Sequence, residues 1–220
     1  PARAADLTHL HTWVFALDNT LYPPECDLFA LIDDRMTRFV MAELSLGWDE
    51  ARGLQKKYYH EHGTTLAGLM AHHGMAPRRF LDEVHDIALD RIGPDPALAA
   101  ALSRLPGRRL VYTNGSTRHA ERVTAALGID HLFDEIFDIE AAAFVPKPDP
   151  AAFAAMIAAH GVAPRSGAFF EDLAKNLAPA AALGLTTILV GPHAQDGAED
   201  FVHHRALALT PFLETARVSA

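Results

Sequence analysis

The hydrophobic positions of this chain follow two different patterns. Short apolar runs rich in β-branched and aromatic residues alternate with longer stretches in which apolar residues recur every three or four positions. A run of the first kind predicts a strand covered on both faces, and the longer spacing predicts a helix. Strands that alternate with helices indicate an α/β fold, here a doubly wound Rossmann-like parallel sheet. The expected strands are residues 12–17, 110–113, 133–139, 168–170 and 186–190.

A long helical block interrupts this alternation. Between Asp27 and about Leu105 the apolar spacing is helical and predicts no strand. Such a block, placed after the first strand of an α/β core, indicates an inserted helical cap domain. Residues 1–11 are expected to be a loose lead-in to the first strand. The expected domains are a core of residues 1–21 and 106–220 and a cap of residues 22–105.

Composition narrows the possible functions. Half of the 220 residues are hydrophobic, enough for one good core with a small accessory domain. The net charge of −9 argues against a nucleic-acid polymer as partner, because proteins that grip phosphate backbones are usually basic. The single cysteine, Cys26, excludes an internal disulfide and fits a reducing compartment. The sequence offers no apolar run of membrane-spanning length and no secretory signal, so we expect a soluble cytoplasmic monomer or small homo-oligomer.

Four polar clusters lie beside the expected strands. In a doubly wound sheet such loops meet at one edge, where ligands bind. Their carboxylates suit Mg²⁺, and their lysine and loop amides suit a phosphoryl group. Each cluster alone is commonly a turn, a helix start or a helix cap, but four in this order indicate a shared site. The clusters are Asp18-Asn19-Thr20, Thr113-Asn114-Gly115, Lys147-Pro148-Asp149 and Glu171-Asp172.

The same clusters carry a family resemblance. The segment Ala16-Leu17-Asp18-Asn19-Thr20-Leu21 resembles the first motif of the haloacid-dehalogenase-like (HAD) phosphohydrolases, Asp-x-Asp-x-Thr-Leu, with alanine in place of the first carboxylate. By the same resemblance, the second motif of the family corresponds to Thr113-Asn114, the third to Lys147 and the fourth to Glu171-Asp172. A closer resemblance, to the pyrimidine 5′-nucleotidase branch, rests on further segments. These are Leu17–Pro23, Tyr58–Leu66, His119-Ala120 and Asn176.

The resemblance implies a role for each motif residue. Position 16 is that of the nucleophile, which attacks phosphorus and forms an aspartyl-phosphate. Asp18 would protonate the leaving oxygen and then activate water. Lys147 would neutralise charge on the phosphoryl group and at the nucleophile position. The phosphate oxygens would be held by Thr113, by the amides of Asn114 and Gly115, and by Lys147.

A magnesium ion and a cap-bound leaving group complete the expected site. Mg²⁺ would be held by Asp172, by the backbone carbonyl of Asp18, by Glu171 directly or through water, and by the carboxylate that Ala16 lacks. The leaving group would face Tyr22 and, in the cap, Gly63, Thr64, Thr65 and Leu66. Tyr58 and Tyr59 are neighbours on one helix, so at most one can face the site, and the sequence does not say which. The expected substrate is a small phosphomonoester, a nucleoside monophosphate by the branch resemblance.

Ala16 removes an attacking oxygen and a metal ligand at once. Loss of a nucleophile has cost other enzymes on the order of a million-fold in turnover, so we expect this chain to be nearly inactive. Because Asp18, Lys147 and Asp172 are kept, an engineered Asp→Ala substitution is favoured over a natural protein that has lost catalysis. Three alternatives stay open: a haloacid dehalogenase, a phosphomutase of the same fold, and a non-catalytic binding module.

The thirteen histidines invite a metal-binding interpretation, which the sequence does not favour. His60, His62, His72 and His73 are expected to decorate cap helices. For His119, packing at a helix start is favoured over a hydrogen bond near the substrate.

Overall fold

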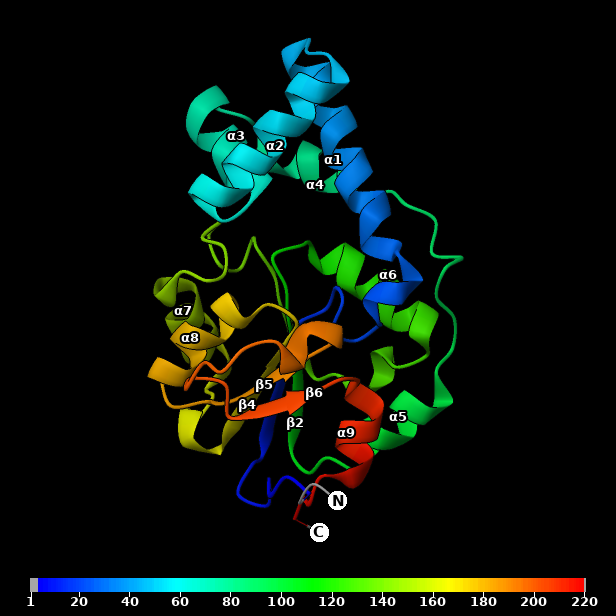
Figure 1. Ribbon diagram of the computed structural model, residues 1–220, viewed down its shortest axis with the longest axis vertical. Coiled ribbons are helices and arrows are strands. Elements are labelled where there is room, and N and C mark those ends of the chain that lie inside the picture. Colours follow the sequence, from blue (N-terminus) through cyan, green and yellow to red (C-terminus); the bar gives the residue numbers. More distant parts are fainter. Residues whose placement is uncertain (1–3, 220) are drawn as a thin grey trace.

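A parallel sheet organises the molecule. The computed structural model describes residues 4–219, and within these the sheet has six strands in the order β3-β2-β1-β4-β5-β6, every neighbouring pair parallel (Figure 1). This order confirms the predicted doubly wound α/β fold. The strands are β1 (Thr12–Phe15), β2 (Arg108–Tyr112), β3 (Glu135–Phe137), β4 (Gly167–Glu171), β5 (Thr186–Val190) and β6 (His204–Ala206).

The central position of β1 in the sheet explains why its sequence is apolar. All four residues of β1 are buried, since β2 and β4 pair with it on both edges. Trp13 and Phe15 enter one core cluster and Val14 the other, so each face of the strand lies under a layer of helices. A strand packed on both faces needs apolar side chains on both, which is why the run after Thr12 is unbroken.

Helices cover both faces of the sheet. Buried side chains of α5, α6 and α9 join the cluster that contains Trp13, and those of α7 and α8 join the cluster that contains Val14. In Figure 1 the two groups lie on opposite sides of the strands. These helices are α5 (Pro96–Ser103), α6 (Thr117–Leu127), α7 (Pro150–His160), α8 (Ala174–Ala182) and α9 (Leu209–Thr215). Short 3₁₀ helices are Pro24–Cys26, Asp130–Leu132, Pro164–Ser166 and Pro192–Gln195.

The remaining helices form the cap, which stands above the sheet in Figure 1. It contains α1 (Leu28–Leu44), α2 (Trp48–His62), α3 (Thr65–His73) and α4 (Pro77–Val84), and α1 packs against both α2 and α4. The helix α5 lies away from them and packs against α9. We therefore propose that the cap ends after α4 rather than at the expected residue 105.

Two features of the core differ from the sequence expectations. The lead-in is not loose, because Leu7 and Leu10 are fully buried and the Leu7 amide donates to the carbonyl of Arg217 at 2.8 Å. The sheet also gains β6, which the sequence did not predict, since its three residues are too few for a clear period. Within residues 4–219, none of the helices combines the length and the apolar character that crossing a membrane requires.

Two glycines of the cap give a matched test of its packing. A Cβ at Gly68 of α3 would overlap the ring of Tyr58 on α2, whereas a Cβ at Gly53 of α2 meets nothing within 4 Å. We expect Gly68→Ala to lower the free energy of unfolding by about 1–3 kcal/mol through overpacking. Gly53→Ala should instead raise it by up to about 1 kcal/mol, because alanine favours the helix. Chemical denaturation of both variants checks this, and equal effects at the two positions would contradict the α2–α3 packing.

Candidate functional site

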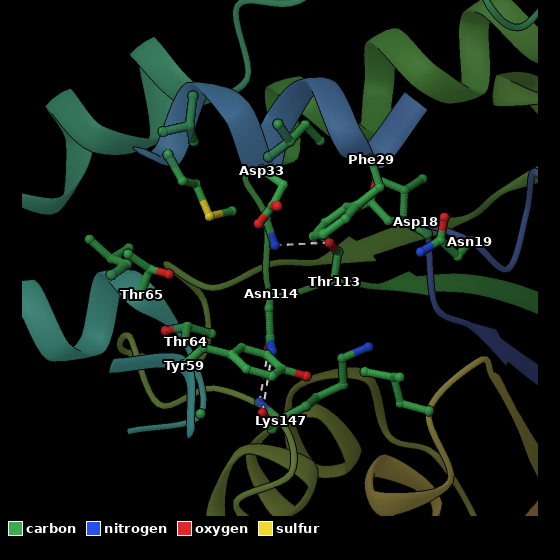
Figure 2. Close-up of a pocket in the computed structure, with 18 of the residues that line it drawn as sticks. Asp18, Asn19, Phe29, Asp33, Tyr59, Thr64, Thr65, Thr113, Asn114 and Lys147 are labelled. Atoms are coloured by element: carbon green, nitrogen blue, oxygen red, sulfur yellow. Dashed lines mark hydrogen bonds between the residues drawn. The ribbon is translucent and has the colours of Figure 1, made fainter. Parts of the chain in front are cut away.

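The loops that follow β1, β2 and β4 meet beneath the cap around one pocket. Its volume is about 380 Å³, and both domains line it. Figure 2 shows side chains from the core and from the cap pointing into it. The structure brings together, along its wall, the predicted site residues Ala16, Asp18, Gly63, Thr64, Thr65, Leu66, Thr113, Asn114, Gly115, Lys147, Glu171 and Asp172. Tyr22 does not line the pocket itself but contacts Asp18, which does.

The loop after β1 holds Asp18 in a fixed position. Its Oδ1 accepts a hydrogen bond of 2.7 Å from the Tyr22 hydroxyl, and His119 Nε2 lies 3.0 Å from the same oxygen. Burial acts to raise the pKa of Asp18, but the charge and hydrogen bond of His119, with the hydrogen bond of Tyr22, hold it below its ordinary value. The backbone turns after Asp18, where the Leu21 amide donates to the Leu17 carbonyl, and the buried Tyr22 lies beside Asp18.

A pair of stacked histidines backs this carboxylate. The ring of His119, which is fully buried, lies 4.4 Å from the ring of His85 at an angle of 8°. His85 Nδ1 lies 3.2 Å from the hydroxyl of Ser116, and His85 also lines the pocket. Burial, followed by the charge of His119, lowers the pKa of His85 to about 3. No sequence motif marks His85, which follows α4 of the cap and reaches the site through tertiary packing.

Lys147 forms a buried ion pair with Glu171. Its Nζ lies 2.7 Å from Glu171 Oε2 and donates to the carbonyl of Tyr112 at 3.2 Å. The ammonium group also lies over the rings of Tyr112 and Phe169, at 5.1 and 5.4 Å from their centroids. Burial acts to raise the pKa of Glu171, but the charge of Lys147, together with hydrogen bonds from Asp172, Lys147 and Asn176, keeps that pKa below its ordinary value. Glu171 is therefore a charged partner of the lysine.

The loop after β2 fastens the loop that carries Lys147. Asn114 Oδ1 accepts from the Lys147 amide at 2.8 Å, and Asn114 Nδ2 donates to the Lys147 carbonyl at 3.3 Å, the contacts drawn as dashed lines in Figure 2. The Gly115 amide donates to Thr113 Oγ1 at 2.9 Å. The side chain of Asn114 thus positions the loop of Lys147, while Thr113 and Gly115 also line the pocket.

Asp172 and its neighbours have the chemistry of a Mg²⁺ site. Burial, then the hydrogen bond and charge of Glu171, raise the pKa of Asp172 to about 9. Asn176 Oδ1 is buried and, among residues 4–219, has no hydrogen-bond partner. Carboxylate and amide oxygens are ligands that hard cations prefer, and a cation would offset the like charges of the two carboxylates. These residues therefore fit the expected ion.

The cap contributes the opposite wall. Gly63 lies against Pro146, so close that an added Cβ would stand 3.3 Å from its Cγ. Tyr59 lines the pocket (Figure 2). Its hydroxyl accepts a hydrogen bond of 2.8 Å from Lys175 Nζ of α8. Tyr58 instead packs between α2 and α3, where its ring stacks on that of His72. Of the two neighbouring tyrosines, Tyr59 is the one that faces the pocket.

A polar group on the cap was not anticipated from the sequence. Asp33 Oδ1 accepts from Gln55 Nε2 at 2.7 Å and from Lys56 Nζ at 2.8 Å, and all three residues line the pocket. The aromatic ring of Phe29 lies in the same wall (Figure 2). These residues come from two helices whose sequence pattern shows only amphipathicity, so no motif could have marked them.

Comparison with known proteins matches this chain to a hydrolase family. The family model of the haloacid dehalogenase-like hydrolases matches residues 14–184. "Phosphate metabolism protein 8" of Saccharomyces cerevisiae is 30% identical over 193 residues, which are 80% of this chain and 60% of that protein. A "Phosphoglycolate phosphatase" of Haemophilus influenzae is 36% identical over 78 residues, 36% of this chain and 34% of that protein. The chain thus spans less than two thirds of the length of these curated relatives.

Solved structures share the fold. A HAD phosphatase from Thermococcus onnurineus superposes with a TM-score of 0.62 at 16% identity, over 95% of this chain and all (100%) of that chain. An L-2-haloacid dehalogenase from Xanthobacter autotrophicus gives 0.61 at 17% identity, over 93% and 97%. A HAD hydrolase of Bacillus subtilis described as bound to magnesium gives 0.55 at 13% identity, over 93% and 96%. At these identities the likeness extends to the architecture and the cap.

The buried His85 should make stability depend on pH. Its pKa falls from the ordinary 6.5 to about 3 in the folded state, so below about pH 6.5 the unfolded chain binds a proton that the folded chain does not. The contribution of His85 to the free energy of unfolding is complete above about pH 6.5. It is lost on acidification, at roughly 1.4 kcal/mol per pH unit at most. We expect His85→Gln to flatten the decline in the free energy of unfolding between about pH 6.5 and pH 4.

Urea denaturation across that pH window measures the effect. His131→Gln, which replaces an exposed side chain, is the matched control and should keep the parent's pH dependence. An unchanged slope in His85→Gln would show that His85 takes up its proton as readily in the folded state as in the unfolded one.

Proposed function

This chain belongs to the haloacid dehalogenase-like hydrolase family, and we propose that its pocket is the site of a Mg²⁺-dependent phosphomonoester hydrolase in which Ala16 stands at the nucleophile position. The observation that supports this most is the environment of Asp18. An acid two residues beyond position 16, held by Tyr22 and His119 beside Lys147 and Asp172, is what phosphate chemistry needs. Displacement of a halide needs neither that acid nor the metal.

The proposed mechanism assigns two steps to the core residues. With an aspartate at position 16, its carboxylate attacks phosphorus while Asp18 gives a proton to the leaving oxygen. Asp18 then takes a proton from water, which attacks the aspartyl-phosphate and releases inorganic phosphate. A bound phosphoryl group raises the pKa of a neighbouring carboxyl, as a general acid at this position requires.

The other residues would position the phosphoryl group and neutralise its charge. Lys147, Thr113 and the amides of Asn114 and Gly115 would hold the phosphoryl oxygens. Mg²⁺ would be held by Asp172, Glu171, the Asp18 carbonyl and the carboxylate at position 16, and when bound it supplies charge neutralisation for the transferring group. The cap residues Gly63–Leu66 would close over the leaving group and exclude water.

The proposed substrate is a nucleoside monophosphate of the pyrimidine type. The sequence resemblance to the 5′-nucleotidase branch supports this choice. The cap wall adds aromatic rings, Phe29 and Tyr59, on which a base can stack, and a polar group around Asp33 that offers hydrogen bonds. A cytoplasmic location and a monomeric or small homo-oligomeric state stay predictions.

Substituting Ala16→Asp should create the phosphatase activity that this chain lacks. We expect the variant to release phosphate from UMP and CMP with Mg²⁺ at a kcat on the order of a million-fold above the Ala16 chain. A phosphate-release assay with both nucleotides and a panel of other phosphomonoesters measures this.

Ala16→Asn is the matched control for that experiment. It has the size of aspartate but no attacking carboxylate, so it should stay as inactive as the Ala16 chain. If Ala16→Asp leaves the whole panel intact, the phosphatase assignment fails; activity on other phosphomonoesters alone would disprove only the nucleotide substrate.

A second substitution separates phosphatase from dehalogenase. In the Ala16→Asp background, Asp18→Asn removes the proton donor while keeping the size of the side chain and its contacts with Tyr22 and His119. We expect kcat for phosphate release to fall by roughly 10²–10⁴-fold, the usual contribution of general acid–base catalysis. Halide release from a 2-haloacid is assayed in parallel. Release in the Ala16→Asp chain that survives Asp18→Asn would favour the dehalogenase instead.

A further inference from the structure

Three potential metal ligands converge on the cap, outside the pocket. Glu61 and His62 end α2, and His72 lies on α3. One ligand atom from each lies within 4.8 Å of the others, and the Nε2 atoms of the two histidines are 2.9 Å apart. None of the three lines the pocket, so the proposed phosphatase site does not account for them.

Ring contacts with Tyr58 orient the two histidines before any ion binds. The helices α2 and α3 approach closely where Gly68 lies under the ring of Tyr58. That ring stacks on the His72 ring, with centroids 5.1 Å apart and planes at 4°. The hydroxyl of Tyr58 in turn contacts His73 Nε2 at 2.7 Å. The orientation of His72 is thus set by a buried tyrosine and not left to the solvent.

The donor set suits a borderline divalent ion. Two imidazole nitrogens and one carboxylate oxygen, with the fourth position open to water, form a set that Zn²⁺ accepts. Two nitrogens bound to one zinc at about 2.0–2.1 Å lie roughly 3.4 Å apart in tetrahedral geometry, so the observed pair must open by only about half an ångström. Without metal, an N–H···N hydrogen bond can account for the pair alone, but it gives no role to Glu61.

We propose that Glu61, His62 and His72 form a zinc site on the cap. The ion joins the C-terminal end of α2 to α3. Gly63 and Thr64, which connect these helices, line the pocket, and Gly63 lies against the loop of Lys147. Zinc at this position therefore fixes the turn that the cap presents to the pocket. This role does not depend on which reaction the pocket performs.

Titration of the purified, metal-free chain with ZnCl₂ tests the proposal. Calorimetry should show saturable binding at a stoichiometry of about one, with a Kd below about 10 µM, and the thermal midpoint should rise with zinc concentration. His72→Phe keeps a ring to stack on Tyr58 but removes the ligand, so the Kd should increase roughly tenfold or more. Glu61→Gln changes an exposed residue and should also weaken zinc binding. It provides the test if His72→Phe does not fold.

Two control variants locate the ion. His60→Ala removes an exposed histidine of α2 outside the cluster and should bind zinc as the parent does. Asp172→Asn removes a ligand of the proposed Mg²⁺ site and should also leave zinc affinity unchanged. The proposal is overturned if zinc shows no saturable binding up to about 100 µM, if both cluster variants bind like the parent, or if Asp172→Asn abolishes binding.

Discussion

The buried ion pair between Lys147 and Glu171 is the interaction on which the site depends. The two side chains are 5% and 2% exposed, and their charged atoms are 2.7 Å apart. Removing one partner of such a pair leaves an unpaired charge in the interior, at a cost of about 3–5 kcal/mol. The lysine backbone is also bound to Asn114, so one residue joins the ends of β2 and β4 to its own loop. The groups proposed for phosphate binding thus hold the loops together.

The sequence predicted those parts of the fold and site that depend on local pattern. The strand ends were predictable because each polar cluster directly follows an apolar run, and parallel strands bring such ends to one edge. His85 could not be found this way, since it reaches the site through the stacking of its ring on His119, which is 34 positions further along the chain. The hydrogen bond from Tyr22 to Asp18 has no signal in the sequence, and the expected role of Tyr22 toward the leaving group stays a prediction. The apolar residues of α5 have the same spacing as those of the cap helices. Its packing against α9 is what distinguishes it from them.

The cap shows why substrate choice is harder to predict than reaction class. The core residues of the pocket sit on loops fixed by the sheet and by ion pairs. The cap residues Asp33, Gln55 and Lys56 bond to one another across two helices, so their positions follow from helix packing. Lys175 of α8 reaches Tyr59 and ties the two walls together. A shift of α2 against α1 would move the cap groups on α2 that line the pocket while leaving the groups proposed for phosphate binding in place.

Position 16 is where stability and catalysis compete most directly. The pocket already brings Asp18, Glu171 and Asp172 near a single buried lysine, and burial together with the charge of Glu171 raises the pKa of Asp172 to about 9. A fourth carboxylate at position 16 would add like charge to this interior, which a bound divalent cation offsets. In the proposed mechanism, alanine lacks the charge, the metal ligand and the attacking oxygen together. The change proposed to remove catalysis would thus also relieve the metal-free chain of repulsion, as expected where an active site gathers groups that oppose folding.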